Sequence, residues 1–200
     1  MKIGMVGAGV VAQAIARSAI GVGHEVVLCN SGTADRLAEV VSALGPRASA
    51  ATTTEVAGAD IVLLAVPWLA VKDALQPIPN WHGRIVIDAT NPFVQLEPKL
   101  VLADLGGDSA SERVADLLPG ARVVKAFNSI LMKRFEEGSA VGSTRRVLFV
   151  SGDDGDAKAT VSELIESFGF AAVDLGSLAW GGRLQQAGGA LAGLDILVAS

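Results

Sequence analysis

The stretch Gly7-Ala8-Gly9-Val10-Val11-Ala12 decides the fold, because it follows the apolar run 3–6 and opens a segment with helical periodicity. The spacing G-x-G-x-x-A between a strand and a helix is typical of a dinucleotide-binding turn. Gly7 permits the tight turn, Gly9 lets the backbone approach a pyrophosphate, and Ala12 lets the helix pack close to the strand. The N–H groups and dipole of the helix N-terminus would then stabilise the phosphates. The competing interpretation is that these glycines only make a turn.

Composition limits the class of protein. The chain has 200 residues, 50% of them hydrophobic, and a formal net charge of −5, so it can bury a sizeable core as one compact unit. Its Lys and Arg residues are scattered, which argues against a nucleic-acid or membrane-surface partner. Apolar runs are too short for a membrane span and the single Cys29 cannot form an internal disulfide, so we expect a cytoplasmic protein. The His, Cys and Asp residues lack metal-ligand spacing, so no metal is expected.

Strand and helix patterns alternate along the chain, which is typical of a parallel sheet covered on both faces. We expect strands at residues 2–6, 24–29, 48–50, 61–66, 84–88, 122–127, 146–151 and 171–175, and helices at 10–20, 33–44, 53–57, 70–75, 109–118 and 156–168. The predicted fold class is α/β: a Rossmann-type, doubly wound, mainly parallel sheet with a small C-terminal strand-helix-strand extension. Residues 1–130 would form the dinucleotide-binding domain and residues 131–200 the extension, joined in one compact unit.

Ligands of such sheets bind beyond the carboxyl ends of the strands, so the residues that follow each strand form the candidate site. Most have small, amide or hydroxyl side chains, which suit hydrogen bonding to a cofactor and supply almost no acid–base chemistry. They include Asn30, Ser31, Gly32, Thr33, Val66, Pro67, Trp68, Asn91, Pro92 and Asn128. Packing is the alternative role for Trp68, and a simple turn is the alternative for residues 91–92.

The second expected strand bears on the choice of dinucleotide. An NAD site usually has Asp or Glu about 20 residues beyond the glycines, where the carboxylate binds the ribose hydroxyls and repels a 2′-phosphate. This chain has Cys29-Asn30-Ser31-Gly32-Thr33 there, without an acid. Asn30, Ser31 and Thr33 can donate hydrogen bonds to a phosphate, and Arg36 follows one helical turn later. The sequence therefore favours NADP(H); helix capping by Ser31 and Thr33 and a merely exposed charge at Arg36 are the alternatives.

Six motifs carry a resemblance to a known family. They are GHEVVL at 23–28, VPW at 66–68, IVIDATNP at 85–92, VVKAFNS at 123–129, SGDD at 151–154 and DLGSL at 174–178. In their order and spacing the chain resembles the coenzyme F420-dependent NADP oxidoreductase family over essentially all of its length, and it is similar to the cytoplasmic NADPH domain of six-transmembrane metalloreductases. The resemblance implies hydride transfer between NADP(H) and a small redox partner, F420 or a flavin such as FMN or FAD, and a homodimer.

The same resemblance implies roles for single residues. Pro67, Asn91, Ala126 and Asn128 would surround the nicotinamide, and Ile130 and the segment 181–188 would lie near the second ring. The family often has Ser-Arg where this chain has Ser31-Gly32, so the preference for NADP over NAD and the identity of the acceptor stay open. Because two stacked cofactor rings exchange the hydride themselves, no catalytic side chain is expected.

Residues outside these motifs have simpler interpretations. His24 and His82 are interpreted as structural or solvated. The glycine-rich, apolar segment 184–198 would complete the acceptor pocket and contribute a dimer contact, since an apolar surface of that kind usually marks an interface.

Two other functions fit parts of the sequence. Imine reductases and β-hydroxy acid dehydrogenases share the N-terminal pattern but add a large helical domain, for which the residues after Ile130 are too few. A non-catalytic NADP(H) sensor, which reports nucleotide occupancy to a partner, would use the same turn and stays open. Loss of NADPH on addition of a flavin or F420 would separate the enzyme from the sensor.

Overall fold

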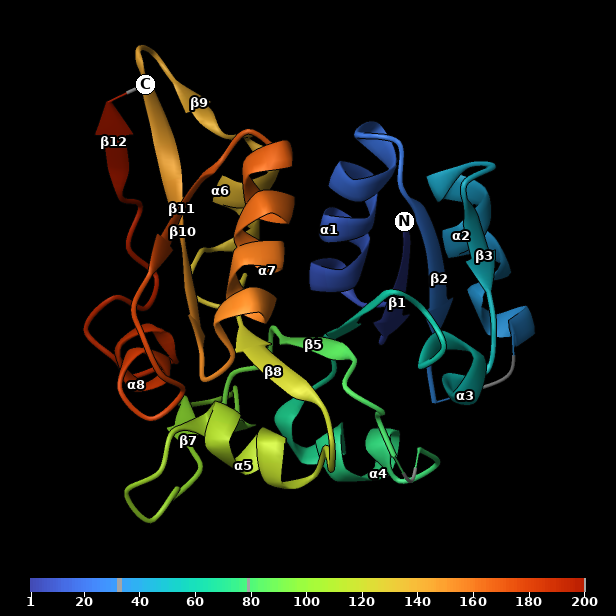
Figure 1. The fold of residues 1–200 in the computed structure, drawn as a ribbon, viewed down its shortest axis with the longest axis horizontal. Helices are drawn as coiled ribbons and strands as arrows, with labels where there is room; N and C mark the ends of the chain where they lie inside the picture. The colour runs from blue at the N-terminus through green and yellow to red at the C-terminus, as the bar shows by residue number, and fades with distance from the viewer. Residues whose placement is uncertain (32–33, 79, 200) are drawn as a thin grey trace.

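One twisted sheet with helices on both sides forms the centre of the computed structural model (Figure 1). The structure describes residues 1–31, 34–78 and 80–199, without the side chains of Ala34 and Arg36. The strand order is β11-β10-β8-β5-β4-β1-β2-β3, with β9 and β12 paired to β10. Strands β1 (Lys2–Val6), β2 (Glu25–Cys29), β3 (Ala48–Ala50), β4 (Ile61–Leu64), β5 (Ile85–Asp88) and β8 (Arg122–Lys125) are parallel. The predicted fold class is confirmed, and the strand order reverses between β1 and β4.

Helices cover both faces of this sheet. Helices α1 (Val10–Gly21), α6 (Met132–Glu136) and α7 (Gly155–Ser167) pack on one face, and α3 (Thr53–Val56), α4 (Val71–Leu75) and α5 (Ala110–Asp116) pack on the other. Strand side chains alternate between the two cores: Ile3 and Met5 join the cluster of α1, and Val6 joins the cluster of α3 and α4. All residues of β4 and β5 are buried, as expected of strands covered on both faces.

The C-terminal part extends the same sheet. Strand β10 (Thr144–Gly152) is antiparallel to β8, and its end pairs Ser151 with Lys125 and Gly152 with Val124. Strand β11 (Ala171–Asp174) follows α7 and runs parallel to β10. The short strands β9 (Ala140–Val141) and β12 (Leu197–Ala199) also pair with β10. The two parts of the sheet therefore meet at the carboxyl end of β8.

Several short elements were not predicted. They are the hairpin of β6 (Phe93–Gln95) and β7 (Val101–Leu102), helices α6 and α8 (Gly181–Gln185), and strands β9 and β12. The helix expected at 33–44 is a 3-10 turn, Ala34–Leu37, followed by α2 (Ala38–Leu44), and a 3-10 turn at Trp68–Ala70 precedes α4. Such segments have too few residues to reveal a period of 3.6 or 2. In the described part of the chain, no helix combines the length and apolar character that crossing a bilayer requires.

Candidate functional site

A cavity of about 780 Å³ lies at the carboxyl ends of β1, β2 and β4, next to the point where the strand order reverses. The predicted site residues in its lining are Gly7, Ala8, Gly9, Asn30, Ser31, Val66 and Pro67. Val6, Cys29, Ala51, Thr52, Thr53, Thr54, Ala65, Ala70, Asp73, Ala74 and Pro77 complete the lining. A second hollow, of about 520 Å³, lies at the amino ends of β1 to β3, whereas parallel sheets bind ligands at the carboxyl ends.

The turn between β1 and α1 has the conformation that its glycines predict. Gly7 has φ of 114°, and a Cβ there would lie 2.3 Å from the carbonyl oxygen of Ala65, so the turn needs glycine for conformation and for space. Gly9 is the N-cap of α1, and apart from the adjoining chain no heavy atom of the described residues lies within 4 Å of where its Cβ would be. Gln13 donates from Nε2 to the carbonyl of Ala8 at 2.8 Å and so braces the turn. The helix N-terminus consequently opens on free space, as an anion site requires.

The segment after β2 contributes Asn30 and Ser31 to the cavity. The predicted Gly32 and Thr33, and the side chain of Arg36, lie outside the described residues. Asp73 of α4 is the one charged side chain in the described lining. The described lining therefore favours hydrogen bonding to a phosphate over ion pairing with it.

A run of threonines, Thr52 to Thr54, forms a wall of the cavity that sequence reasoning missed. Thr52 caps α3, and its hydroxyl and N–H both interact with the carboxylate of Glu55. The hydrogen bond from the Thr52 N–H lowers the pKa of Glu55. These threonines follow β3, so the rule that ligands bind beyond strand ends could have found them. Beside them, burial raises the pKa of the Cys29 thiol, which favours its neutral form.

Other predicted residues lie around the cavity rather than in its lining. Val10 is exposed at the start of α1, and Val11 packs against the core. Trp68 is half-buried and packs against the core cluster of α4 and α5. Its placement agrees with the packing role that the sequence left open.

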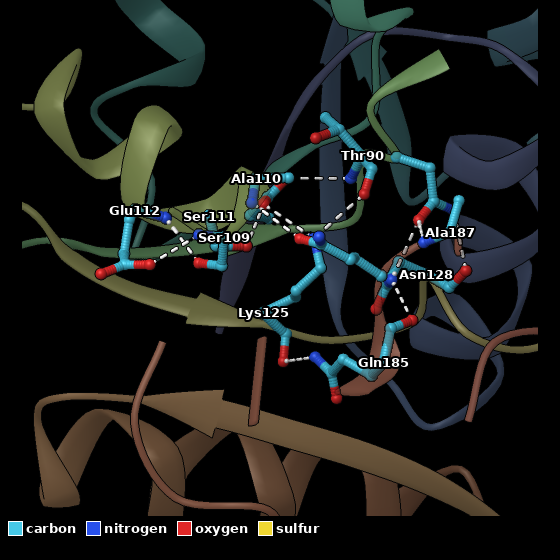
Figure 2. Close-up of polar contacts among 12 residues, drawn as sticks. Thr90, Ser109, Ala110, Ser111, Glu112, Lys125, Asn128, Gln185 and Ala187 are labelled. Carbon is cyan, nitrogen blue, oxygen red and sulfur yellow. Dashed lines mark hydrogen bonds and ion pairs between the residues drawn. The ribbon is translucent and has the colours of Figure 1, made fainter. Parts of the chain in front are cut away.

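Asn91 and Asn128 are brought together from the ends of β5 and β8, although they are far apart in the sequence. Figure 2 shows Asn128 close to Gln185 and Ala187 of the C-terminal segment. Asn91 donates from Nδ2 to the carbonyl of Asn128 at 2.9 Å, and Asn128 donates from Nδ2 to Oδ1 of Asn91 at 3.1 Å. Their neighbours Pro92 and Ala126 are buried, and Ala126 belongs to the core beneath the strand ends. The two asparagines thus form one reciprocal amide pair at the sheet edge.

The C-terminal segment docks on this pair. Gln185 of α8 accepts from Asn128 Nδ2 through its carbonyl at 2.8 Å, and the N–H of Ala187 donates to Asn91 Oδ1 at 2.9 Å. Gln186 accepts from the N–H of Ala110 at 2.7 Å, and the N–H of Gly193 donates to the carbonyl of Ser129 at 2.7 Å. The sequence predicted that this segment approaches the site, but it did not predict α8 or these contacts.

The histidines lie apart from this arrangement. His24 precedes β2 at the amino end of the sheet, where burial lowers its pKa, and His82 is exposed in a loop with φ of 46°. Within the described residues, His, Cys, Asp and Glu form no group of three that could hold a metal ion.

Comparisons with known proteins give the family. The family model described as NADP oxidoreductase, coenzyme F420-dependent, matches residues 2–92. A candidate F420-dependent NADP reductase from Arthrobacter sp. FB24 is 30% identical in sequence, with a TM-score of 0.74 over 89% of this chain and 86% of that chain. This chain belongs to the F420-dependent NADP oxidoreductase family. A hypothetical protein from Sinorhizobium meliloti is also similar, with 37% identity and a TM-score of 0.91 over 99% of this chain and 96% of that one.

A curated relative extends the same resemblance. Metalloreductase STEAP3 of Rattus norvegicus is 30% identical over 182 residues, which are 89% of this chain and 34% of the relative. The chain thus spans about a third of the length of that relative. Membership of an NADP-dependent oxidoreductase family explains why a dinucleotide turn and a cavity with little acid–base chemistry occur together.

Proposed function

We propose that the protein transfers a hydride between NADP(H) and a flavin or an F420-type deazaflavin. The observation that carries the proposal is the unobstructed Gly9 at the start of α1, which opens on a cavity large enough for part of a dinucleotide. The bound cofactors supply the redox chemistry, because the hydride passes directly from the dihydronicotinamide to the second ring. The task of the protein is then to bind and orient both rings.

In this proposal the first part of the cavity binds the adenosine and phosphate groups. The turn Gly7 to Gly9, with the adjoining Val10 and Val11, would hold the pyrophosphate through backbone N–H groups. Asn30, Ser31, Gly32, Thr33 and Arg36 would bind the 2′-phosphate; of these, Asn30 and Ser31 line the cavity together with Thr53 and Thr54. NADP over NAD is supported here by the family and by the absence of an acid directly after β2.

The nicotinamide and the acceptor ring would lie further along the same sheet edge. Val66, Pro67 and Trp68 come from the end of β4, and Asn91, Pro92, Ala126 and Asn128 come from the ends of β5 and β8. The amide pair of Asn91 and Asn128 supports this placement, because fixed amides suit a carboxamide group. The docked segment 181–188 supports an acceptor pocket completed by residues 131–200.

Stereospecific deuteride transfer tests the proposal. The purified protein is mixed anaerobically with NADPH, deuterated at one face of C4, and with FMN, FAD or F420 in turn. We expect loss of NADPH absorbance with one acceptor and deuterium in the reduced acceptor from one face only. Tight NADPH binding without turnover for any acceptor would favour a nucleotide sensor instead.

A homodimer and a cytoplasmic location complete the proposal. Large apolar side chains are exposed around the C-terminal segment, with Trp180 72% and Leu194 50% accessible. Apolar surface of this kind is usually covered in an assembly. Light scattering at two protein concentrations tests the dimer, and fractionation of the source cells tests the location.

A further inference from the structure

A buried ion pair joins the carboxyl ends of β5 and β8, next to the amide pair. Figure 2 shows its lysine, Lys125, close to Thr90. Asp88 and Lys125 are directly opposite in the strand register, both side chains are fully buried, and Lys125 Nζ is 3.1 Å from Asp88 Oδ2. Ser111 of α5 donates from Oγ to the same carboxylate oxygen at 2.5 Å. Neither charged side chain lines the cavity. The function proposed above therefore gives this pair no direct contact with a cofactor.

Asp88 and Lys125 both form hydrogen bonds with the backbone of the loop that leads to Asn91. Asp88 Oδ1 accepts from the N–H of Thr90 at 2.9 Å, and Lys125 Nζ donates to the carbonyl of Thr90 at 3.1 Å. The two backbone polar groups of Thr90 are thus bound by opposite members of the ion pair. A shift of the ion pair would therefore move Asn91, which follows Thr90 in the chain.

Lys125 is also connected to the loop that carries Asn128 and to the C-terminal segment. Its carbonyl accepts from Gln185 Nε2 at 2.9 Å, and the carbonyl of Gln185 accepts from Asn128 Nδ2 at 2.8 Å. Its backbone pairs with Ser151 of β10, where the two parts of the sheet meet. One buried lysine therefore links β5, β8, β10 and α8 immediately behind the amide pair.

Stability alone is a poor explanation for this arrangement. Well-packed apolar side chains often replace a buried ion pair without loss of stability, because burial removes both charges from water. Thr90 Oγ1, Asn128 Oδ1 and Gln185 Oε1 are buried without a hydrogen-bond partner among the described residues. Phe127, which lies between Lys125 and Asn128 in the chain, has φ of 64°, a backbone conformation that residues with bulky side chains rarely adopt. Strain and unpaired polar atoms concentrate at functional sites.

We propose that Asp88 and Lys125 are positioning residues that fix Asn91 and Asn128 in the orientation that hydride transfer requires. The inference rests on the function proposed above, since it takes these asparagines as the nicotinamide end of the site. Reacting atoms must approach to about 3–3.5 Å, and a misplacement of about 1 Å costs about a hundredfold in rate. Directional polar contacts from four elements restrict the loops more tightly than apolar packing would.

Three variants separate positioning from folding. Lys125→Met removes one charge and keeps most of the side-chain volume, whereas Asp88→Asn combined with Lys125→Met removes both charges. Lys158→Met is the control, because Lys158 pairs with Asp174 at 2.8 Å and hydrogen-bonds neither asparagine in the described structure. For each protein we measure the single-turnover rate of hydride transfer, the fluorescence of bound NADPH, the melting temperature, and the affinity for 2′-phospho-ADP-ribose, which lacks the nicotinamide.

We expect both Lys125 variants to transfer hydride about a hundredfold more slowly, while their affinity for 2′-phospho-ADP-ribose stays within about twofold of wild type. The double variant should recover the melting temperature, because it leaves no unpaired buried charge, but it should not recover the rate. If Lys125→Met alone fails to fold, the double variant can therefore still test the positioning role. The fluorescence of bound NADPH should also change in both variants, and Lys158→Met should keep all wild-type values except a small change in melting temperature.

Two results would overturn the positioning role. One is a double variant with the wild-type transfer rate and fluorescence, and the other is a loss of 2′-phospho-ADP-ribose affinity in step with the rate. A wild-type protein that binds NADPH but reduces no acceptor would refute the proposed reaction, and the fluorescence comparison would then decide the positioning role by itself. Failure of wild type to bind NADPH would refute both.

Discussion

Substitution of the two turn glycines should separate folding from binding. In Gly7→Ala the new Cβ meets the Ala65 carbonyl at 2.3 Å, at a backbone φ of 114°. Such a conformation costs about 1–3 kcal/mol before the clash is relieved. At about 2–4 °C per kcal/mol for a chain of this size, we expect a melting temperature at least several degrees lower. The apo protein should show this loss, because no cofactor contributes to it.

Gly9→Ala should have the opposite signature. Gly9 has φ of −77° and ψ of −173°, which alanine adopts freely, and beyond the adjoining chain its Cβ would meet no atom of the described structure within 4 Å. Alanine restricts the unfolded chain, which stabilises the folded state by about 0.4–1 kcal/mol, but alanine is a poorer N-cap than glycine and loses a similar amount. The melting temperature should therefore hardly change. The Cβ would enter the space proposed for the pyrophosphate. Loss of one charge-assisted hydrogen bond, worth about 1.5–3 kcal/mol, weakens NADPH binding at least about tenfold.

Calorimetry decides between these expectations. Scanning calorimetry gives the melting temperatures of the apo proteins, and titration calorimetry gives the dissociation constants for NADPH at fixed ionic strength. Wild-type affinity in Gly9→Ala would refute the assignment of the pyrophosphate to this turn. An unchanged melting temperature in Gly7→Ala would refute the account of why the turn needs glycine.

Three further predictions test other parts of the molecule. Ser31→Arg should raise the ratio of NADPH to NADH affinity about tenfold or more, because it adds a cation beside the neutral Asn30, and an unchanged ratio would place the 2′-phosphate elsewhere. The hydrogen bond from Arg134 lowers the pKa of Glu137 below 4.5, so the Glu137 carboxylate stabilises the fold above that pH. This contribution disappears as the pH falls through the lowered pKa. In Glu137→Gln, the melting temperature should therefore depend less on pH on the acid side. Because burial raises the pKa of Cys29, the native thiol should react with a disulfide reagent near about pH 8 far more slowly than the denatured one, and equal rates would contradict its burial.

The sequence predicted the parts of this protein that depend on local patterns. Strands β2 and β4 each contain four consecutive apolar residues followed by a polar or small one, and the bounds of β1 and β3 agree with the expected ranges. The turn at residues 7–9 was recognisable because conformation, space and helix start all constrain the same few positions. These features are encoded within about ten residues of the chain, which periodicity and turn chemistry can reveal.

The rest depends on contacts between distant residues. Lys125 lies within the strand expected at residues 122–127, and its burial against Asp88 becomes visible only when β5 and β8 lie side by side. The amide pair joins positions 37 residues apart, and the contact between Ala187 and Asn91 spans 96. No local period carries such information. Short elements such as α8 form because their neighbours hold them, so their own sequence predicts them weakly.

The phosphate end and the ring end of the proposed site differ in the groups that would bind the cofactors, so substitutions should affect the two ends differently. The phosphate end that we propose would use backbone N–H groups and the space beside Gly9, so it should tolerate changes in side chains nearby but no added atoms at the turn. In the site that we propose, the ring end would use the side-chain amides of Asn91 and Asn128, which the buried ion pair holds in place, so loss of either charge should disturb it. Affinity for the adenosine half and the rate of hydride transfer should therefore respond to separate sets of residues. Lys125 belongs to the second set, because its contacts in the described structure reach Asp88, Thr90 and Gln185 and none reaches the turn Gly7 to Gly9.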